Sequence, residues 1–313
     1  MSRIFKVGQP SLDSPRIDWC HVQYPQAARE DWLNAIVTFR NGLGPGLMTL
    51  QVAPVDWLFP EFQPGQYVTL GLFASSKRSR LAAPELHAPA PERLIRRPYS
   101  IASPPENREV LEFYINLVPA GALTPRLFQV TAGDRISLGS KVAGSFTLSS
   151  VPEDANLILI ATGTGVAPYI SMLTSNPAFR KPRRIALLHG VRQSRDLGYR
   201  SVLTALQRDQ PAFTYVPVVS RLQSEASPWT GAVGHVQDVW KRGVLKRSLG
   251  FCPKPENTHV LLCGNPAMIE SMISLLAGEG FQRQTPRQPG QVHFEKFWQA
   301  NTPPPSGETQ EPA

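Results

Sequence analysis

Residues 156–173 read NLILIATGTGVAPYISML, and this stretch decides the fold. Residues 157–161 are apolar without alternation, which is typical of a parallel strand covered on both faces. The strand leads into Thr-Gly-Thr-Gly at 162–165, and a helical pattern begins near Val166. Glycines let the backbone approach an anion, and a helix N-terminus directs N–H groups toward it. The stretch therefore predicts a phosphate-binding loop; an ordinary tight turn is the alternative interpretation.

The segments after this stretch alternate between strand and helix. Strand patterns at 157–161, 184–189, 214–219 and 259–262 alternate with helical patterns at about 167–175, 196–208, 235–241 and 266–278, and 292–297 could add a last strand. This alternation predicts a doubly wound parallel sheet with helices on both faces. Ligands of such sheets bind at the carboxyl ends of the strands. The loops expected there are 162–165, 189–192, 220–221 and 263–265.

The segments before about residue 152 have a different pattern. Short strand-like runs at 35–39, 47–52, 62–70, 99–102, 110–117 and 134–138 are separated by turns, which predicts an antiparallel barrel or sandwich. Residues 74–96 read as a long basic loop. The predicted layout is an N-terminal extension (1–30), a β domain (31–151), an α/β domain (152–298) and a flexible tail (299–313).

Composition and charge narrow the class of protein. A chain of 313 residues with 42% hydrophobic and 18% charged residues is typical of a soluble protein of two domains. It has neither a run of about 18 apolar residues nor an N-terminal apolar segment, so we expect a cytoplasmic protein without a membrane span. The dispersed Cys20, Cys252 and Cys263 argue against a cysteine-ligated iron–sulfur or zinc site.

The net charge of +8 favours an anionic partner, which could be a nucleic acid, a cofactor or an acidic protein. The basic residues are scattered and are not interleaved with aromatic ones, so we do not expect nucleic acid. A basic surface that only keeps the protein soluble is the remaining interpretation.

Three motifs occur in an order that matches a known family. They are Arg97-Pro-Tyr-Ser100, the glycine loop that ends at Pro168, and Cys263-Gly-Asn-Pro-Ala-Met268. With further matches at 111–114, 123–127, 218–221 and 297–298, residues 32 to 298 resemble the plant-type ferredoxin reductase superfamily, and most of all its bacterial ferredoxin/flavodoxin–NADP reductases. This resemblance implies an FAD-binding antiparallel Greek-key β-barrel, followed by an NADP-binding doubly wound α/β domain.

The flavin motif has a chemistry that suits FAD. Arg97 can offer a planar fork of donors to a diphosphate, Tyr99 can lie along the ring or the ribityl chain, and Ser100 can hydrogen-bond the reactive nitrogen. An ordinary alternating strand is the alternative. The resemblance extends the FAD contacts to this set: Arg97, Pro98, Tyr99, Ser100, Tyr114, Ile115, Asn116, Gly121, Ala122, Leu123, Thr124, Thr164, Phe297 and Trp298.

The arginines and the serine expected at two strand ends suit a 2′-phosphate. Arg221 stands beside Ser220 after a predicted strand, and Arg192 matches a second family arginine, although it could be a solvated loop residue. Bacterial relatives carry a third arginine after a Thr-Gly pair, where this chain has Ala232, so we expect a weakened preference for NADP. The expected NADP contacts are Gly163, Thr164, Gly165, Arg192, Ser220, Arg221, Cys263, Gly264, Asn265 and Met268.

Three residues are expected at the centre of the reaction, which uses no metal. Ser100 contacts the flavin, Cys263 lines the nicotinamide site without a covalent role, and Glu295 positions the nicotinamide or passes protons. The alternatives are a core thiol for Cys263 and a surface carboxylate for Glu295.

The resemblance implies a monomeric reductase. NADPH would give a hydride to FAD, and the flavin would pass single electrons to ferredoxin or flavodoxin. Such carriers are generally acidic, and a basic loop with Lys77, Arg78, Arg80, Arg93 and Arg96 is the candidate docking surface. The alternatives are a stand-alone flavin reductase or oxygenase reductase component, a non-catalytic electron-transfer subunit, and a purely structural protein.

Overall fold

The computed structural model describes residues 32–85, 87–175, 183–249 and 251–296. The predicted N-terminal extension, the predicted tail, Phe297 and Trp298 lie outside these ranges. All elements described below belong to one unit, which begins at Leu33.

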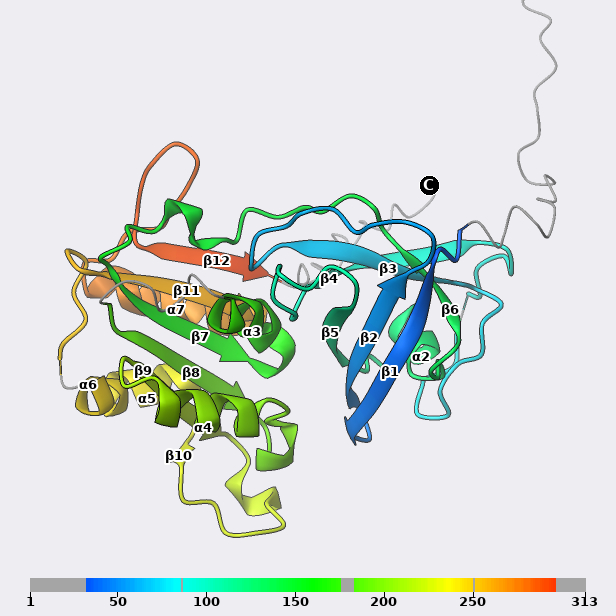
Figure 1. Cartoon of the computed structure of the whole chain (residues 1–313). Helices are drawn as coiled ribbons and strands as arrows, with labels where there is room; N and C mark the ends of the chain where they lie inside the picture. The colour runs from blue at the N-terminus through cyan, green and yellow to red at the C-terminus, as the bar shows by residue number, and fades with distance from the viewer. Residues whose placement is uncertain (1–31, 86, 176–182, 250, 297–313) are drawn as a thin grey trace, which may run out of the picture. The chain divides into compact units, whose positions relative to one another are not determined.

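The first half of this unit is a six-stranded antiparallel sheet with the strand order β4-β3-β6-β1-β2-β5 (Figure 1). The sheet curls so that its two edge strands, β4 and β5, meet. The Ala102 N–H, just after β4, donates to the Glu112 carbonyl in β5 at 2.8 Å. A barrel therefore forms, and not a sandwich. Its elements are β1 (Ala35–Gly44), β2 (Leu47–Pro54), β3 (Tyr67–Phe73), β4 (Leu94–Ser100), β5 (Leu111–Asn116), α2 (Thr124–Leu127) and β6 (Arg135–Leu138).

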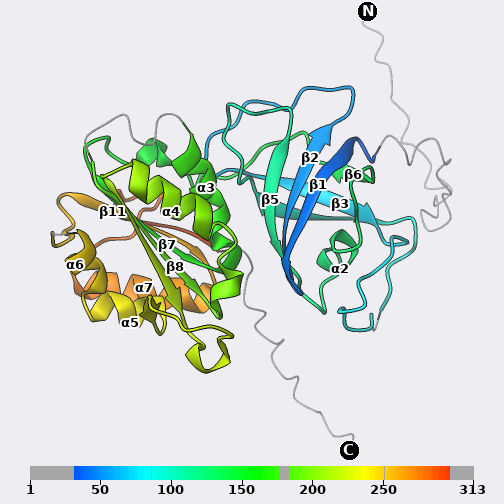
Figure 2. The same ribbon diagram turned by 60° about the horizontal axis from the view of Figure 1, so that its bottom comes forward.

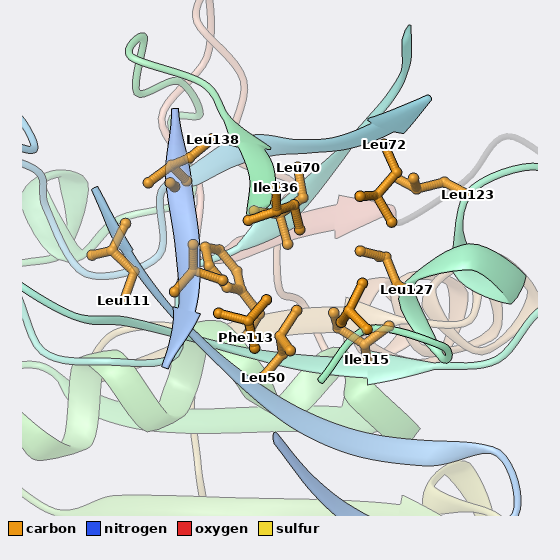
Figure 3. Close-up of a cluster of buried hydrophobic side chains, with 14 of the residues drawn as sticks. Leu50, Leu70, Leu72, Leu111, Phe113, Ile115, Leu123, Leu127, Ile136 and Leu138 are labelled. Carbon is orange, nitrogen blue, oxygen red and sulfur yellow. The ribbon is translucent and has the colours of Figure 1, made fainter. Parts of the chain in front are cut away.

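Alternating side chains of these strands fill the barrel. Leu50 from β2, Leu70 from β3 and Phe113 from β5 point toward one another, together with Leu127 from α2 (Figure 3). All four side chains are fully buried. The short helix α2 therefore contributes Leu127 to the core of the barrel.

The second half is a six-stranded parallel sheet with the order β10-β9-β8-β7-β11-β12. Helices α3 and α4 cover one face and α5, α6 and α7 the other (Figure 2). The strands are β7 (Asn156–Thr162), β8 (Ile185–Val191), β9 (Phe213–Val219), β10 (Ala232–Val233), β11 (Thr258–Gly264) and β12 (Val292–Lys296). The helices are α3 (Ala167–Thr174), α4 (Arg200–Asp209), α5 (Val236–Lys241), α6 (Val244–Leu249) and α7 (Pro266–Gly278).

This arrangement confirms the predicted fold class, a β-barrel followed by a doubly wound α/β sheet. The chain leaves β7 toward β8 on one side and returns to β11 on the other, so the strand order reverses between β7 and β11. A crevice at the carboxyl ends of the strands opens at such a reversal. The glycine turn after β7 and the Cys263-Gly264 end of β11 flank this point.

Several local predictions were wrong. Strand β4 begins at Leu94, inside the segment read as a loop, because ladder bonds to β3 hold Arg96 and Arg97 in extended form. Helix α4 begins at Arg200 and not near residue 196, because Ser194–Asp196 forms a separate 3-10 turn. Elements α2, α6 and β10 were not predicted.

The change from the antiparallel to the parallel sheet falls between Leu138 and Asn156, so the boundary near 151 stays a prediction. No helix in the described ranges has the length and apolar character needed to cross a bilayer.

Candidate functional site

The glycine turn after β7 has space for a ligand at one glycine and none at the other. Gly163 has φ +54°, and, its chain neighbours aside, no atom of the described residues lies within 4 Å of the point where a Cβ would be. At Gly165 a Cβ would overlap the Cys263 carbonyl, so this glycine lets the turn press against the end of β11. The open backbone at Gly163 is therefore the surface that an anion can approach.

Hydrogen bonds fasten this turn to the end of β11. The Asn265 N–H donates to Thr162 Oγ1 at 2.9 Å, and Asn265 Oδ1 caps α7 by accepting from the Ala267 N–H at 2.8 Å. Gly264 has φ +128° and packs against Thr162, which leaves no room for a side chain. Two strand ends from distant parts of the sequence thus form one rigid edge. Thr164 lies half-buried within this turn.

His189 supports the glycine turn from below, a role that the sequence did not reveal. Its ring is fully buried at the end of β8, and Nε2 lies 2.9 Å from the Gly163 carbonyl. Burial lowers the pKa of His189 to about 4, so the ring is neutral near pH 7 and Nε2–H donates to that carbonyl. Only its place at a predicted strand end pointed toward the site.

Ser100, Cys263 and Glu295, the three residues expected at the centre of the reaction, lie close together. Ser100 Oγ, at the end of β4, donates to Glu295 Oε2 at 3.3 Å. Glu295 on β12 is the register partner of Cys263 on β11. This hydrogen bond joins the end of a barrel strand to the carboxyl ends of the parallel sheet.

Burial changes how these groups ionise. It raises the pKa of Glu295 from its ordinary 4.5 to about 7, and the Ser100 hydrogen bond opposes the shift. Burial also raises the pKa of the Cys263 thiol, and the nearby Glu295 carboxylate raises it further. Cys263 is therefore a neutral thiol without nucleophilic character, whereas Glu295 titrates near neutral pH.

The expected flavin residues of β4 lie at the barrel surface. Arg97 and Pro98 are exposed, and Tyr99 is half-buried against the barrel core. The Arg97 guanidinium donates to the adjacent Arg96 carbonyl at 2.7 Å. Within the described ranges this leaves most of its five donors available to an anion.

Tyr114 on β5 has a structural role that the resemblance did not show. Its hydroxyl donates to the Asp196 carbonyl at 3.1 Å and accepts from the Gly198 N–H at 3.0 Å. Its ring is buried and packs edge-on against Tyr199. The hydroxyl therefore joins the barrel to the loop before α4 and does not point to an open surface.

The other expected flavin residues near β5 and α2 differ in exposure. Asn116 is exposed, but the side chains of Ile115 and Leu123 are buried in the barrel core, so only their backbones can face a cofactor. Thr124 Oγ1 accepts from the Val118 N–H at 3.0 Å, and Gly121 and Ala122 lie half-buried in the turn that this bond closes. The turn is built to present backbone groups.

Arg126 organises this turn from within, a role that was not predicted from the sequence. Its side chain is 3% exposed and donates to the carbonyls of Ala74 and Ala122 and to both Glu85 carboxylate oxygens, at 2.9 and 3.0 Å. Glu85 also pairs with Arg78. Arg78, which the sequence analysis included in the candidate docking surface, is thus half-buried and holds the loop together through Glu85.

The expected 2′-phosphate residues lie together at the ends of β8 and β9. The Arg221 N–H donates to the Arg192 carbonyl at 2.9 Å, and Ser220 Oγ donates to the Val191 carbonyl at 3.1 Å. Both arginine side chains are exposed. Met268, by contrast, is buried in the core under α7, so its side chain packs and does not face the edge.

Phe297 and Trp298, which are expected to contact FAD, lie outside the described residues. In the ranges that the structure describes, no group of three or more His, Cys, Asp or Glu residues could hold a metal ion.

Comparison with known proteins identifies the family. Residues 159–273 match the oxidoreductase NAD-binding domain. A flavodoxin/ferredoxin–NADP reductase from Escherichia coli is 30% identical over 270 residues, which cover 86% of this chain and 99% of the relative. The chain belongs to the flavodoxin/ferredoxin–NADP reductase family. A ferredoxin–NADP reductase from Pseudomonas aeruginosa is 28% identical, covering 85% of this chain and 93% of the relative.

Solved structures support the same fold. A ferredoxin–NADP⁺ reductase from Neisseria gonorrhoeae, solved with bound FAD and NADP, matches with a TM-score of 0.72 at 24% identity, over 84% of this chain and 98% of that one. A cytochrome P450 reductase from Amycolatopsis matches with a TM-score of 0.64 at 27% identity, over 84% of this chain and 69% of that one.

Proposed function

We propose that the protein is an FAD-dependent reductase that passes electrons between NADPH and a one-electron carrier, ferredoxin or flavodoxin. The observation that carries this proposal is the meeting of Ser100 from the barrel with Cys263 and Glu295 beside the glycine turn. A nicotinamide nucleotide with its diphosphate at Gly163 would have its ring among these three residues. The names of the family relatives agree with this activity.

The residues present fit both groups. For FAD, the exposed fork of Arg97 suits a diphosphate, and the neighbouring Tyr99 offers an aromatic face. For NADP, the space at Gly163 is one that a Cβ would fill. FAD, when bound, supplies the redox chemistry, because no amino-acid side chain accepts a hydride reversibly.

The protein would bind, orient and tune. Ser100 would donate a hydrogen bond at the reacting edge of the flavin, as it donates here to Glu295. With its pKa near 7, Glu295 can hold a proton on Oε2 or release it at working pH. The neutral Cys263 thiol would form a small apolar wall beside the nicotinamide.

We propose that the carrier docks on the loop between β3 and β4. Lys77, Arg80 and Arg93 are exposed on this loop, Arg96 is exposed in β4 directly after it, and Leu81 of the loop is 55% exposed. Backbone hydrogen bonds from Ser79 to Pro125 and from Ala83 to Pro119 hold the loop beside residues 121–124, which are expected to contact FAD. Cations around an apolar residue fit a transient complex with an acidic protein. We also propose that the protein acts as a monomer in the cytoplasm.

Salt dependence tests this function and the docking surface together. NADPH oxidation is followed with ferredoxin or flavodoxin as acceptor, and separately with a small neutral dye, as ionic strength rises. We expect the carrier-linked rate to fall more steeply than the dye-linked rate, because screening weakens the charge attraction. Arg80→Glu should lower only the carrier-linked rate. Equal salt loss in both assays would contradict the docking surface, and absence of both rates would contradict the function.

A second candidate is a reductase component of an oxygenase system, or a stand-alone flavin reductase. The similarity to the Amycolatopsis cytochrome P450 reductase favours the former. A higher turnover with an oxygenase partner or with free flavin than with ferredoxin and flavodoxin would select one of these instead.

A further inference from the structure

Arg200 occupies a position that its own helix does not explain. It is the first residue of α4, and its side chain is exposed. A cation in the first turn opposes the helix dipole, so the helix gains no stability from it. In the described parts of the chain no carboxylate forms an ion pair with it. Its guanidinium carbon instead lies 5.0 Å from the centre of the Trp229 ring, a cation–π contact.

Trp229, which the Arg200 guanidinium contacts, lies against the ends of β8 and β9. Its ring packs on Val191, Leu197 and Val219. Val191 and Val219 are the last residues of their strands, directly before Arg192 and Ser220. The tryptophan therefore lies over the edge where the two expected phosphate-binding arginines emerge.

The same tryptophan also holds the strand that follows it. Trp229 Nε1 donates to the Ala232 carbonyl at 3.0 Å, and Ala232 pairs with Val218 on β9. Gly231 between them packs so closely on the indole that it leaves no room for a side chain. Arg200 is thus linked through one side chain to the position where the sequence resemblance leads us to expect an arginine and alanine stands instead.

We propose that Arg200, held on Trp229, determines specificity for the nucleotide 2′-phosphate, together with Arg192 and Arg221. A phosphate monoester carries up to two negative charges and accepts several hydrogen bonds, which suits more than one guanidinium. Stacking on the indole restricts the Arg200 side chain, so less conformational entropy is lost when it binds an anion. The proposal deepens the proposed function and rests on it.

Two fragments that differ only in the 2′-phosphate test the proposal without catalysis. Binding of 2′,5′-ADP and of 5′-AMP to the FAD-loaded protein is measured by calorimetry for the native chain, Arg200→Ala and Arg200→Gln. We expect both variants to bind 2′,5′-ADP about tenfold more weakly and 5′-AMP unchanged. The ratio of kcat/KM for NADPH to that for NADH should fall by a similar factor.

Arg208→Ala is the matched control, because Arg208 lies in the same helix and pairs with exposed Asp209. It should leave both affinities unchanged. Equal weakening of both fragments in the Arg200 variants, or no weakening, would overturn the proposal, since a structural role does not distinguish them. If the native chain itself fails to prefer 2′,5′-ADP, the proposed NADP function falls too; if it prefers 2′,5′-ADP and the variants keep that preference, only the role of Arg200 falls.

Discussion

At Gly163, a substitution by alanine should affect both the backbone, through strain, and the space for a ligand. The glycine has φ +54°, and among the described residues beyond its chain neighbours nothing lies within 4 Å of a Cβ position, so Gly163→Ala should fold at a cost of about 1–2 kcal/mol. The new methyl group would fill the space that we assign to the nucleotide diphosphate. We expect NADPH affinity to fall roughly tenfold or more, measured by titration of the FAD-loaded protein.

Gly133→Ala is the control for Gly163→Ala, because Gly133 has φ +96°, equally open surroundings, and a place in the turn before β6. It should lose at least as much stability, because φ +96° lies further from the left-handed region that alanine can adopt, and it should keep native NADPH affinity. The same affinity loss in both variants would mean that strain, and not ligand space, causes it.

The unusual ionisation of Glu295 should appear in the pH dependence of stability. Burial raises its pKa from 4.5 to about 7, so between these values the unfolded chain releases a proton that the folded chain keeps. The free energy of unfolding therefore decreases as pH rises through this window. Glu295→Gln lacks this titration, so its stability relative to the native chain should increase from pH 4.5 to 7 and then level off in denaturant titrations.

Glu270→Gln provides the opposite case. Lys296, through a hydrogen bond, and Arg283 lower the pKa of Glu270, so the stability that it contributes is lost as pH falls below 4.5. This variant should approach native stability only in acid. A Glu295→Gln difference that is flat with pH would show that the carboxyl is not held in a low-dielectric site.

Reading the sequence singled out candidate residues whose motif is local and missed residues whose partner is distant in the chain. Gly163 and Gly165 stand together in one turn, and their spacing was enough to predict an anion site. His189 acts through a carbonyl 26 residues away, and Arg126 through Glu85, 41 residues away. Neither pairing follows from periodicity or spacing, because both depend on how the sheets fold.

At the scale of elements, the Tyr114 hydroxyl joins strand β5 to the loop before α4, and two tyrosine substitutions test how much this connection contributes to stability. Tyr114→Phe removes the hydroxyl that bonds both the Asp196 carbonyl and the Gly198 N–H, and should cost about 1–2 kcal/mol. Tyr215→Phe is the matched change, since the buried Tyr215 hydroxyl has no partner in the described residues. It should leave stability unchanged or raise it. Thermal unfolding compares the two, and an equal effect in both would contradict the connection.

At the element scale, buried strands with continuous apolar runs were predicted well, and β4 was not. β7 and β11 are covered on both faces, so their continuous apolar sequences are enough to predict a buried strand. β4 begins at Leu94, and its first three residues, 94–96, were read as the end of a loop. Its extended form comes from pairing with β3, a tertiary effect that local propensity does not record.

At the scale of the whole molecule, the site exists because two sheets of different type each contribute one side of it. The parallel sheet brings the glycine turn and Cys263 to its point of reversal, and the barrel brings Ser100 to Glu295. The order of motifs along the sequence was enough to predict both sheets. The hydrogen bonds between them could not be predicted, because residues 100 and 295 meet only in the folded chain.

An anaerobic titration with NADPH, and separately with NADH, shows in the visible spectrum whether the protein is an FAD-dependent reductase that prefers NADPH. We expect a yellow protein whose flavin absorbance is bleached stoichiometrically by NADPH and only at much higher concentrations by NADH. An equal response to both nucleotides would contradict the 2′-phosphate site at Arg192, Arg200 and Arg221. A protein that shows no flavin spectrum after FAD is supplied, or whose flavin neither nucleotide reduces, would contradict the assignment as an FAD-dependent NADPH reductase.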